Sequence, residues 1–155
     1  MALDDIKNFF RIDERVGTGG QPTELQLQEL AQGGCQVVLN LGLLDPRYCL
    51  PDEAGLVARL GMSYHHIPVV FDAPNVTELE AYVAAMDANA SARMFVHCAA
   101  NYRVSTFAAL YGQLRLGWSA EEADSHARRF WQPNETWRRF MTEVRRRLRL
   151  DDGHG

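Results

Sequence analysis

The sequence predicts an α/β fold: a compact single domain with a mainly parallel central sheet flanked by helices. Apolar, β-branched segments of strand length alternate along the chain with longer segments of helical periodicity. That alternation is typical of parallel strands joined by helical crossovers, with helices on both faces of the sheet. A chain of 155 residues with 46% hydrophobic and 23% charged residues fits one core, which buries about 70% of the unfolded chain's surface.

Each element has a local reason in the sequence. Residues 8–17 predict an edge hairpin or strand, and apolar runs predict strands at 36–41, 62–70 and 93–97. Helices are predicted at 23–32, 51–60, from 75 or 77 to 90, and at 104–116, 119–131 and 133–150. Thr23 and Gln26 stand in capping-box positions, Pro51 suits a first helical turn, and Gly61 suits a helix end. The domain is expected to span residues 1–150, with 151–155 a disordered tail.

Composition and charge argue against several classes of function. The net charge of −4 argues against nucleic acid as a partner. Six arginines lie between Arg138 and Arg149, and we interpret them as the solvated face of a terminal helix whose apolar stripe packs inward. No apolar run approaches the ~20 residues that span a membrane, and the acidic N-terminus lacks the pattern of a signal peptide. We expect no nucleic-acid or membrane partner, and nothing in the sequence bears on the oligomeric state.

The cysteines point to a reducing compartment. Cys35, Cys49 and Cys98 are an odd number at irregular spacing, which indicates neither a disulfide framework nor a zinc motif. A cytoplasmic location, where a reactive thiol stays reduced, is the natural expectation.

The stretch from Val96 to Thr106 carries the chemistry. A short apolar run delivers Cys98 into a tight turn, and a long helix is predicted to start at Val104. A thiol at such a junction meets unpaired N–H groups and the positive end of the helix dipole, which favour its thiolate. Arg103 in the same turn offers a planar fork for two oxygens of a phosphate, a sulfate or another oxyanion. A nucleophile and an anion cradle within one turn of chain indicate an enzyme.

This stretch resembles the phosphate-binding loop of cysteine-dependent protein tyrosine and dual-specificity phosphatases. Their pattern is His-Cys, five residues, Arg, then Ser or Thr. Counted from Cys98, the arginine position falls on Val104, and Arg103 comes one residue early. The hydroxyl position falls on Ser105. The mid-loop glycine position falls on Asn101, a residue that tolerates a left-handed backbone. Either the arginine is displaced by one position, or the loop is one residue shorter than in that family.

Two further segments carry the resemblance, which covers roughly residues 8 to 118. Residues 64–74 resemble the strand and loop that hold the phosphatase general acid, with Asp72 placed 26 residues before Cys98. Residues 17–23, Gly-Thr-Gly-Gly-Gln-Pro-Thr, resemble an N-terminal motif of a bacterial phosphatase-like group known as a domain of unknown function. The resemblance implies a dual-specificity-phosphatase-like fold.

The resemblance also implies roles for individual residues. Cys98 would attack phosphorus to give a thiophosphoryl enzyme, Arg103 would hold the anion, and Asp72 would protonate the leaving group. Substrate contacts would come from Ala99, Ala100, Asn101, Tyr102, Val104, Ser105 and Gln21, with Ser105 helping the thiolate to leave. The substrate would be a phosphorylated molecule or another oxyanion, and the reaction needs no metal or organic cofactor.

Other interpretations stay open at this point. The Asp-Ala-Pro-Asn stretch around Asp72 is also typical of a turn and a helix cap, and Asp45 is the next carboxylate to consider as the acid. Gln21 and Asn101 could simply shape turns. His97 is expected to order the thiolate loop through hydrogen bonds from a buried position. His65 and His66 would face opposite sides of a strand, which argues against a shared metal.

Two further functions remain as alternatives to an active phosphatase. One is a phosphatase-like module that binds an anionic partner without turnover. The other is a rhodanese-like sulfurtransferase, because such loops can carry a cysteine, four residues and an arginine, as Cys98 to Arg103 do.

Overall fold

The structure is a computed structural model that describes residues 2–150, with side chains from Asp4 onward. Its five-stranded sheet has the order β1-β2-β5-β3-β4. The strands are β1 (Phe10–Arg11), β2 (Val16–Gly19), β3 (Val37–Asn40), β4 (Ser63–His66) and β5 (Met94–His97). Only β1 pairs antiparallel, with β2, and the other neighbours within the described residues pair parallel. The predicted α/β fold with a mainly parallel sheet is confirmed.

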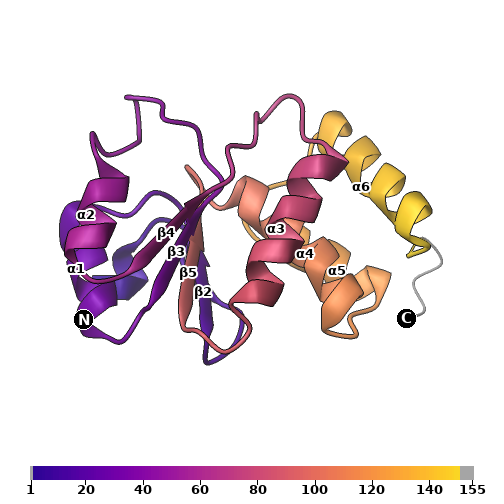
Figure 1. Cartoon of the computed structure of the whole chain (residues 1–155). Helices are drawn as coiled ribbons and strands as arrows, with labels where there is room; N and C mark the ends of the chain where they lie inside the picture. Colours follow the sequence, from indigo (N-terminus) through magenta and orange to yellow (C-terminus); the bar gives the residue numbers. More distant parts are fainter. Residues whose placement is uncertain (1, 151–155) are drawn as a thin grey trace.

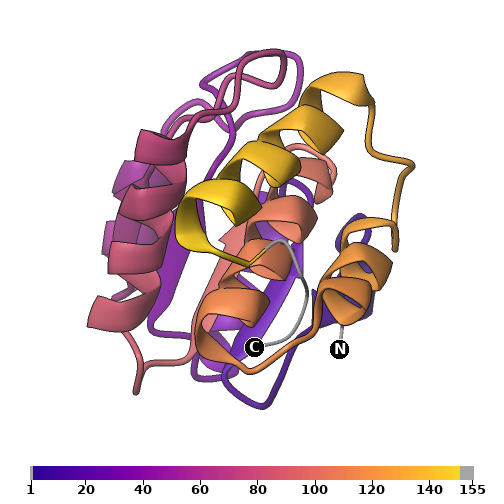
Figure 2. The same ribbon diagram turned by 90° about the vertical axis from the view of Figure 1, so that its right-hand side faces the viewer.

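The helices cover both faces of this sheet (Figure 1). On one face lie α1 (Glu24–Gln32) and α2 (Glu53–Arg59), with the short 3-10 helix η1 (Ala2–Asp5) against α1. On the other lie α3 (Val76–Ala88), α4 (Tyr102–Arg115), α5 (Ala120–Ala127) and α6 (Glu135–Leu148). Figure 2 shows α6 lying over α4, with α3 and α5 on either side. No helix of residues 2–150 has both the length and the apolar character needed to cross a membrane.

The sheet divides the core into two layers because side chains alternate along each strand. In β5, Met94 and Val96 face the cluster formed with α3 to α6, whereas Phe95 faces the cluster beneath α1 and α2. Val37 and Val38 of β3 are split in the same way. All four residues of β5 are buried, so the strand that leads to Cys98 lies inside the core.

Two predicted element ends are wrong, and the other ends lie within two residues of expectation. The strand expected to reach residue 70 ends at His66, because the ring of Pro68 fixes its φ at about −65°, outside the range of a regular parallel strand. The helix expected from Val104 begins two residues earlier, at Tyr102. The helix expected to reach residue 131 ends at Ala127, and the chain beyond it places the Trp131 ring on Tyr102. The tail predicted at 151–155 lies outside the described residues.

His126 on α5 makes the stability of the fold sensitive to acid. Its ring is buried against Phe10 and Trp118, with centroid distances of 5.3 Å to each. Burial, and to a lesser degree the charge of Arg129, lower the pKa of His126 to about 4. As the pH falls, His126 is therefore protonated near pH 6.5 in the unfolded chain but only near pH 4 in the folded chain.

We predict that His126→Phe removes this part of the acid sensitivity. As pH falls from 6.5 to about 4, the wild-type protein should lose up to about 3 kcal/mol of unfolding free energy from this residue. The variant should lose correspondingly less in urea titrations across that pH range. The exposed His65, changed to Gln, is the matched control and should keep the wild-type slope. Equal slopes for wild type and His126→Phe would show that His126 does not carry the effect.

Candidate active site

Cys98 lies where β5 ends, at the edge of the sheet to which the parallel strands point. The preceding residue, His97, pairs with Gly19 of β2 and Asn40 of β3, so Cys98 emerges between two strand ends. The Cys98 side chain is 1% exposed. A Cβ atom on Gly42 would stand 3.5 Å from the Cys98 Cα, so the chain leaving β3 lies directly against the cysteine. The thiol is thus at the floor of its loop and not on the rim.

The loop between strand and helix spans four residues, Cys98 to Asn101. Asn101 adopts the left-handed conformation with φ 69°, the backbone expected at the mid-loop glycine position. Its side-chain nitrogen donates to the carbonyl of Asn8 at 2.8 Å and to Thr18 Oγ1 at 3.1 Å. Asn101 therefore shapes the turn from its backbone and ties it to the first residues of the chain.

Three successive carbonyl oxygens of this loop each lie within hydrogen-bond distance of a nitrogen. The Cys98 oxygen faces His97 Nδ1 at 3.3 Å, and the Ala99 oxygen accepts from the Gln21 N–H at 3.1 Å. The Ala100 oxygen accepts from Asn8 Nδ2 at 2.8 Å. In a trans peptide the C=O and the next N–H point in opposite directions. The N–H groups of Ala99 and Ala100 consequently point away from His97 and Gln21.

The glycine-rich segment after β2 makes this arrangement possible. A Cβ on Gly20 would stand 2.5 Å from the Ala99 oxygen and 3.1 Å from the Ala100 Cα. Only glycine allows the two backbones to run this close.

The helix that follows the loop has an uncapped N-terminus. Among the six α-helices of residues 2–150, five have an N-cap side chain that accepts a hydrogen bond from the first turn: Thr23, Asp52, Asn75, Ser119 and Asn134. The N-cap side chain of α4, Asn101, makes no such bond because its amide is turned toward Thr18. The first N–H groups of α4 have no intrahelical partner and are left for another acceptor.

Arg103 reaches from the first turn of α4 into the protein interior. It is 5% exposed, and its Nη1 donates to the Val69 carbonyl at 2.9 Å. Its Cζ lies 5.9 Å from the centre of the Phe71 ring. Its Nε is buried and has no hydrogen-bond partner within the described chain. A buried guanidinium nitrogen without an acceptor is costly, so this donor suits an oxygen that arrives with a ligand.

The two residues after Arg103, Val104 and Ser105, are buried and have contacts of their own. Val104, which an ungapped comparison puts at the arginine position, is fully buried in the apolar core. Because α4 starts at Tyr102, Arg103 lies in its first turn, next to the loop. The Ser105 hydroxyl donates to the Tyr102 carbonyl at 3.0 Å, so in this arrangement its proton is not directed at Cys98.

The segment that carries Asp72 is held on both sides of the turn that contains it. The Val69 N–H donates to the Leu41 carbonyl at 3.0 Å, and Trp137 Nε1 donates to the Phe71 carbonyl at 2.8 Å. Asp72 itself is exposed. It lies in a turn that is closed by a hydrogen bond from the Ala73 N–H to the Val70 carbonyl.

Asp72 is not a helix cap, since the N-cap of α3 is Asn75, in a capping box with Glu78. Asp45, the alternative acid, is paired with Arg47. Hydrogen bonds from Arg47 lower the pKa of Asp45 to about 2, which makes it a poor proton donor near neutral pH.

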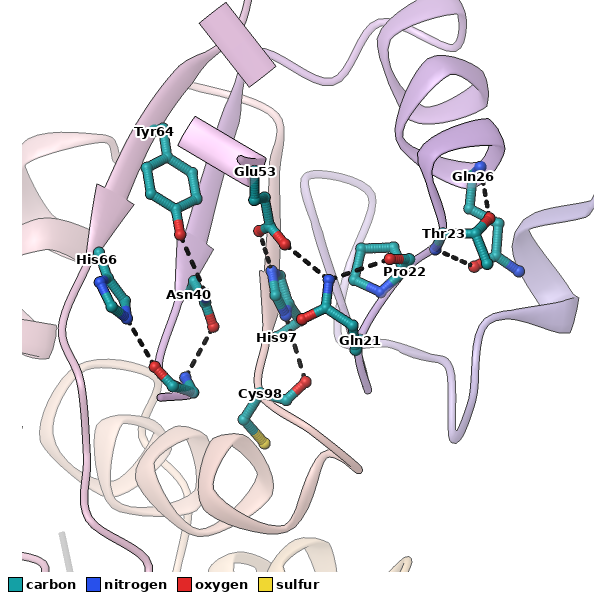
Figure 3. A network of polar contacts seen from close by, with 11 residues as sticks. Gln21, Pro22, Thr23, Gln26, Asn40, Glu53, Tyr64, His66, His97 and Cys98 are labelled. Carbon is teal, nitrogen blue, oxygen red and sulfur yellow. Dashed lines mark hydrogen bonds and ion pairs between the residues drawn. The ribbon is translucent and has the colours of Figure 1, made fainter. Parts of the chain in front are cut away.

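Sequence reasoning missed one site residue, Glu53. Oε2 of its buried carboxylate lies 2.6 Å from His97 Nε2, and Oε1 accepts a hydrogen bond from Gln21 Nε2, also at 2.6 Å (Figure 3). Glu53 is the first residue of α2, where an acidic side chain is ordinarily explained by the helix dipole. The second donor hydrogen bond of Gln21 goes to the Pro22 carbonyl at 3.0 Å. In this structure the Gln21 amide is thus engaged by Glu53 and Pro22.

A second polar network fixes the chain that leaves β3 (Figure 3). The Gly42 N–H donates to Asn40 Oδ1 at 2.7 Å, and the Gly42 carbonyl lies 2.6 Å from His66 Nε2. Asn40 Nδ2 in turn donates to the Tyr64 hydroxyl at 3.0 Å. Since Gly42 lies against Cys98, these contacts hold the wall of the site from the side of β4.

Comparison with known proteins places the chain in a family. No protein-family model and no curated protein matches it, and the family is shown by the solved structures. Among solved structures, it resembles the "Putative phosphatase (DUF442)" from Shewanella putrefaciens CN-32 at 33% identity, covering 94% of this chain and 95% of that one, with a TM-score of 0.83. The chain belongs to the DUF442 family. The predicted resemblance to cysteine-dependent phosphatases is thereby confirmed.

The same fold recurs in more distant phosphatases. Tk-PTP in its active form matches this DUF442 protein with a TM-score of 0.78 and 22% identity, over 90% of this chain and 97% of that one. PTPMT1 in complex with PI(5)P matches with a TM-score of 0.72 and 19% identity, over 93% of this chain and 98% of that one. At these identities the shared feature is the fold, the compact architecture of protein tyrosine and dual-specificity phosphatases.

Proposed function

We propose that this chain is a phosphoric monoester hydrolase that works through a thiophosphoryl intermediate on Cys98. The observation that carries the proposal is the coincidence of three features at one point. A cysteine directly follows the central strand, the next helix begins without a side-chain cap, and a buried nitrogen of Arg103 in that helix has no acceptor within the described residues. A tetrahedral oxyanion supplies acceptors for both sets of donors.

The proposed reaction has two displacement steps. The Cys98 thiolate attacks phosphorus, an S–P bond forms, and the P–O bond to the leaving group breaks. Asp72 gives its proton to the departing oxygen. Water then attacks phosphorus, its proton passes to Asp72, and the S–P bond breaks to regenerate the thiolate. Loop N–H groups of residues 99–104 and the Arg103 guanidinium stabilise the non-bridging oxygens in both steps.

Arg103 also links the anion to the acid. Its Nη1 is engaged by the Val69 carbonyl, three residues before Asp72, while its Nε is without a partner. We propose that Nε takes an oxygen of the substrate while Nη1 keeps its place on the acid-bearing segment. In this way the same side chain would position both the phosphoryl group and the loop that protonates the leaving group.

The relatives support a phosphate ester as substrate. The DUF442 relative carries the name of a phosphatase, and PTPMT1, which shares the fold, forms a complex with PI(5)P. We propose the common chemistry of these proteins for this chain, a phosphate monoester bound by its terminal oxygens.

Cys98→Ser is predicted to abolish hydrolysis while the fold survives. Serine keeps the shape of the side chain but is far harder to ionise than a thiol, so the rate on para-nitrophenyl phosphate should fall at least ~1,000-fold. Vanadate should inhibit the wild-type protein. Cys35 lies before β3, at the opposite end of the sheet, and Cys35→Ser should keep wild-type activity.

The outcome of this experiment decides between the candidate functions. Equal rates for wild type and Cys98→Ser would refute the thiolate mechanism. Turnover of thiosulfate to sulfite, without release of phosphate from esters, would replace the proposal with sulfur transfer. Vanadate binding without any turnover would point to an anion-binding module.

Asp72→Asn is predicted to act according to the leaving group. Hydrolysis of phenyl phosphate, whose leaving group needs a proton, should slow on the order of 100-fold, and hydrolysis of para-nitrophenyl phosphate should slow far less. The basic limb of the pH–rate profile should disappear as well. Asp45→Asn is the matched control, because Arg47 holds that carboxylate ionised, and it should show no such dependence. Uniform slowing across both esters would exclude Asp72 as the acid.

A further inference from the structure

The buried ring of His97 has an oxygen acceptor at each nitrogen. Nε2 lies 2.6 Å from Glu53 Oε2, and Nδ1 lies 3.3 Å from the Cys98 carbonyl oxygen. A neutral imidazole can donate through only one nitrogen, and the other would then set a lone pair against an oxygen. A ring that carries a proton on both nitrogens satisfies both contacts.

Glu53 is arranged as the partner of such a cation. One of its oxygens accepts from His97 and the other from Gln21, so both act as acceptors, as an ionised carboxylate requires. Burial favours the neutral acid, but the hydrogen bonds from His97 and Gln21 outweigh it and lower the pKa of Glu53 below its ordinary value. The two side chains are 0% and 3% exposed, so bulk water screens the pair only weakly.

The remaining titratable groups around the pair lie on β4 and in the loop. Tyr64 stays neutral near pH 7, because burial raises its pKa to about 12. His66, also on β4, helps to lower the pKa of Glu53 through a charge interaction. Its ring is held by a contact with the Gly42 carbonyl. Cys98 follows His97 directly, and its carbonyl oxygen lies 3.3 Å from Nδ1 of the His97 ring.

We propose that Glu53 is a positioning residue for Cys98, acting through His97. The carboxylate keeps the imidazole doubly protonated and fixed in orientation. The ring then holds the Cys98 carbonyl on its own side of the loop and brings a positive charge next to the residue that carries the thiolate. The cation is nearer to Cys98 than its counter-ion is, so the pair as a whole favours negative charge in the loop.

This inference rests on the proposed use of Cys98 as a thiolate, but its test does not require turnover. Thiolate formation is followed by ultraviolet absorbance as a function of pH, and the signal of Cys98→Ser is subtracted to remove Cys35 and Cys49. In Glu53→Gln we expect the midpoint of thiolate formation to move upward by roughly one pH unit. The acid limb of the pH–rate profile should move with it.

Asp52→Asn is the matched control. Asp52 is the neighbouring carboxylate, exposed at the N-cap of α2, and asparagine can replace it as a cap. This variant removes the same charge one residue away without touching His97, and its midpoint should equal that of the wild type. The double variant Glu53→Gln/His97→Gln should show no larger shift than His97→Gln alone, because Glu53 acts through the ring.

Loss of a buried partner can prevent folding, and Glu53→Asp covers that case. Aspartate keeps the charge but withdraws it by one methylene, so a smaller shift in the same direction is expected. A lower melting temperature with an unchanged midpoint in Glu53→Gln, or in Glu53→Asp if the former does not fold, would overturn the proposal. A shifted midpoint in a protein that hydrolyses no phosphate ester would support the positioning role and contradict the phosphatase instead.

Discussion

The site depends on the direction of three backbone carbonyl groups after the central strand. The oxygens of Cys98, Ala99 and Ala100 each lie within hydrogen-bond distance of a nitrogen: in the ring of the preceding His97, in the backbone after β2, and in the side chain of Asn8. Peptide geometry then fixes the opposite direction for the intervening N–H groups. If these oxygens turned inward, the thiol would face negative dipoles and no anion would bind there. The proposed oxyanion cradle thus depends on the donors that surround the loop.

Polar groups around the proposed cradle lack hydrogen-bond partners within the described residues. An ordinary N-cap would satisfy the start of α4, as it does for the other five α-helices, yet the Asn101 amide is directed to Thr18. The Nε of Arg103 is likewise buried without a partner. Each such group costs on the order of 1–3 kcal/mol, and a bound oxyanion would recover it. Together with the buried Glu53–His97 pair, these features place several costly buried polar groups near one cysteine.

The sequence predicted the architecture and the identity of the loop, because both depend on local patterns. Strand and helix periodicity set the fold, and the left-handed preference of asparagine marked Asn101. The sequence placed the start of α4 at Val104, two residues late. The structure shows that Val104 already lies within the helix and packs in the core. Glu53 escaped notice because its partner, His97, is 44 residues away in the chain and becomes a neighbour only when α2 is set beside β5. Contacts of that kind leave no local signal.

The most direct measurement of the central claim is a crystal structure of the wild-type protein soaked with tungstate. We expect the anion above the Cys98 sulfur, within hydrogen-bond distance of the N–H groups that open α4 and of Arg103 Nε, with Arg103 Nη1 still on the Val69 carbonyl. A tungstate bound only elsewhere, at concentrations that saturate the protein, would contradict the account. So would a loop whose carbonyl groups face the anion.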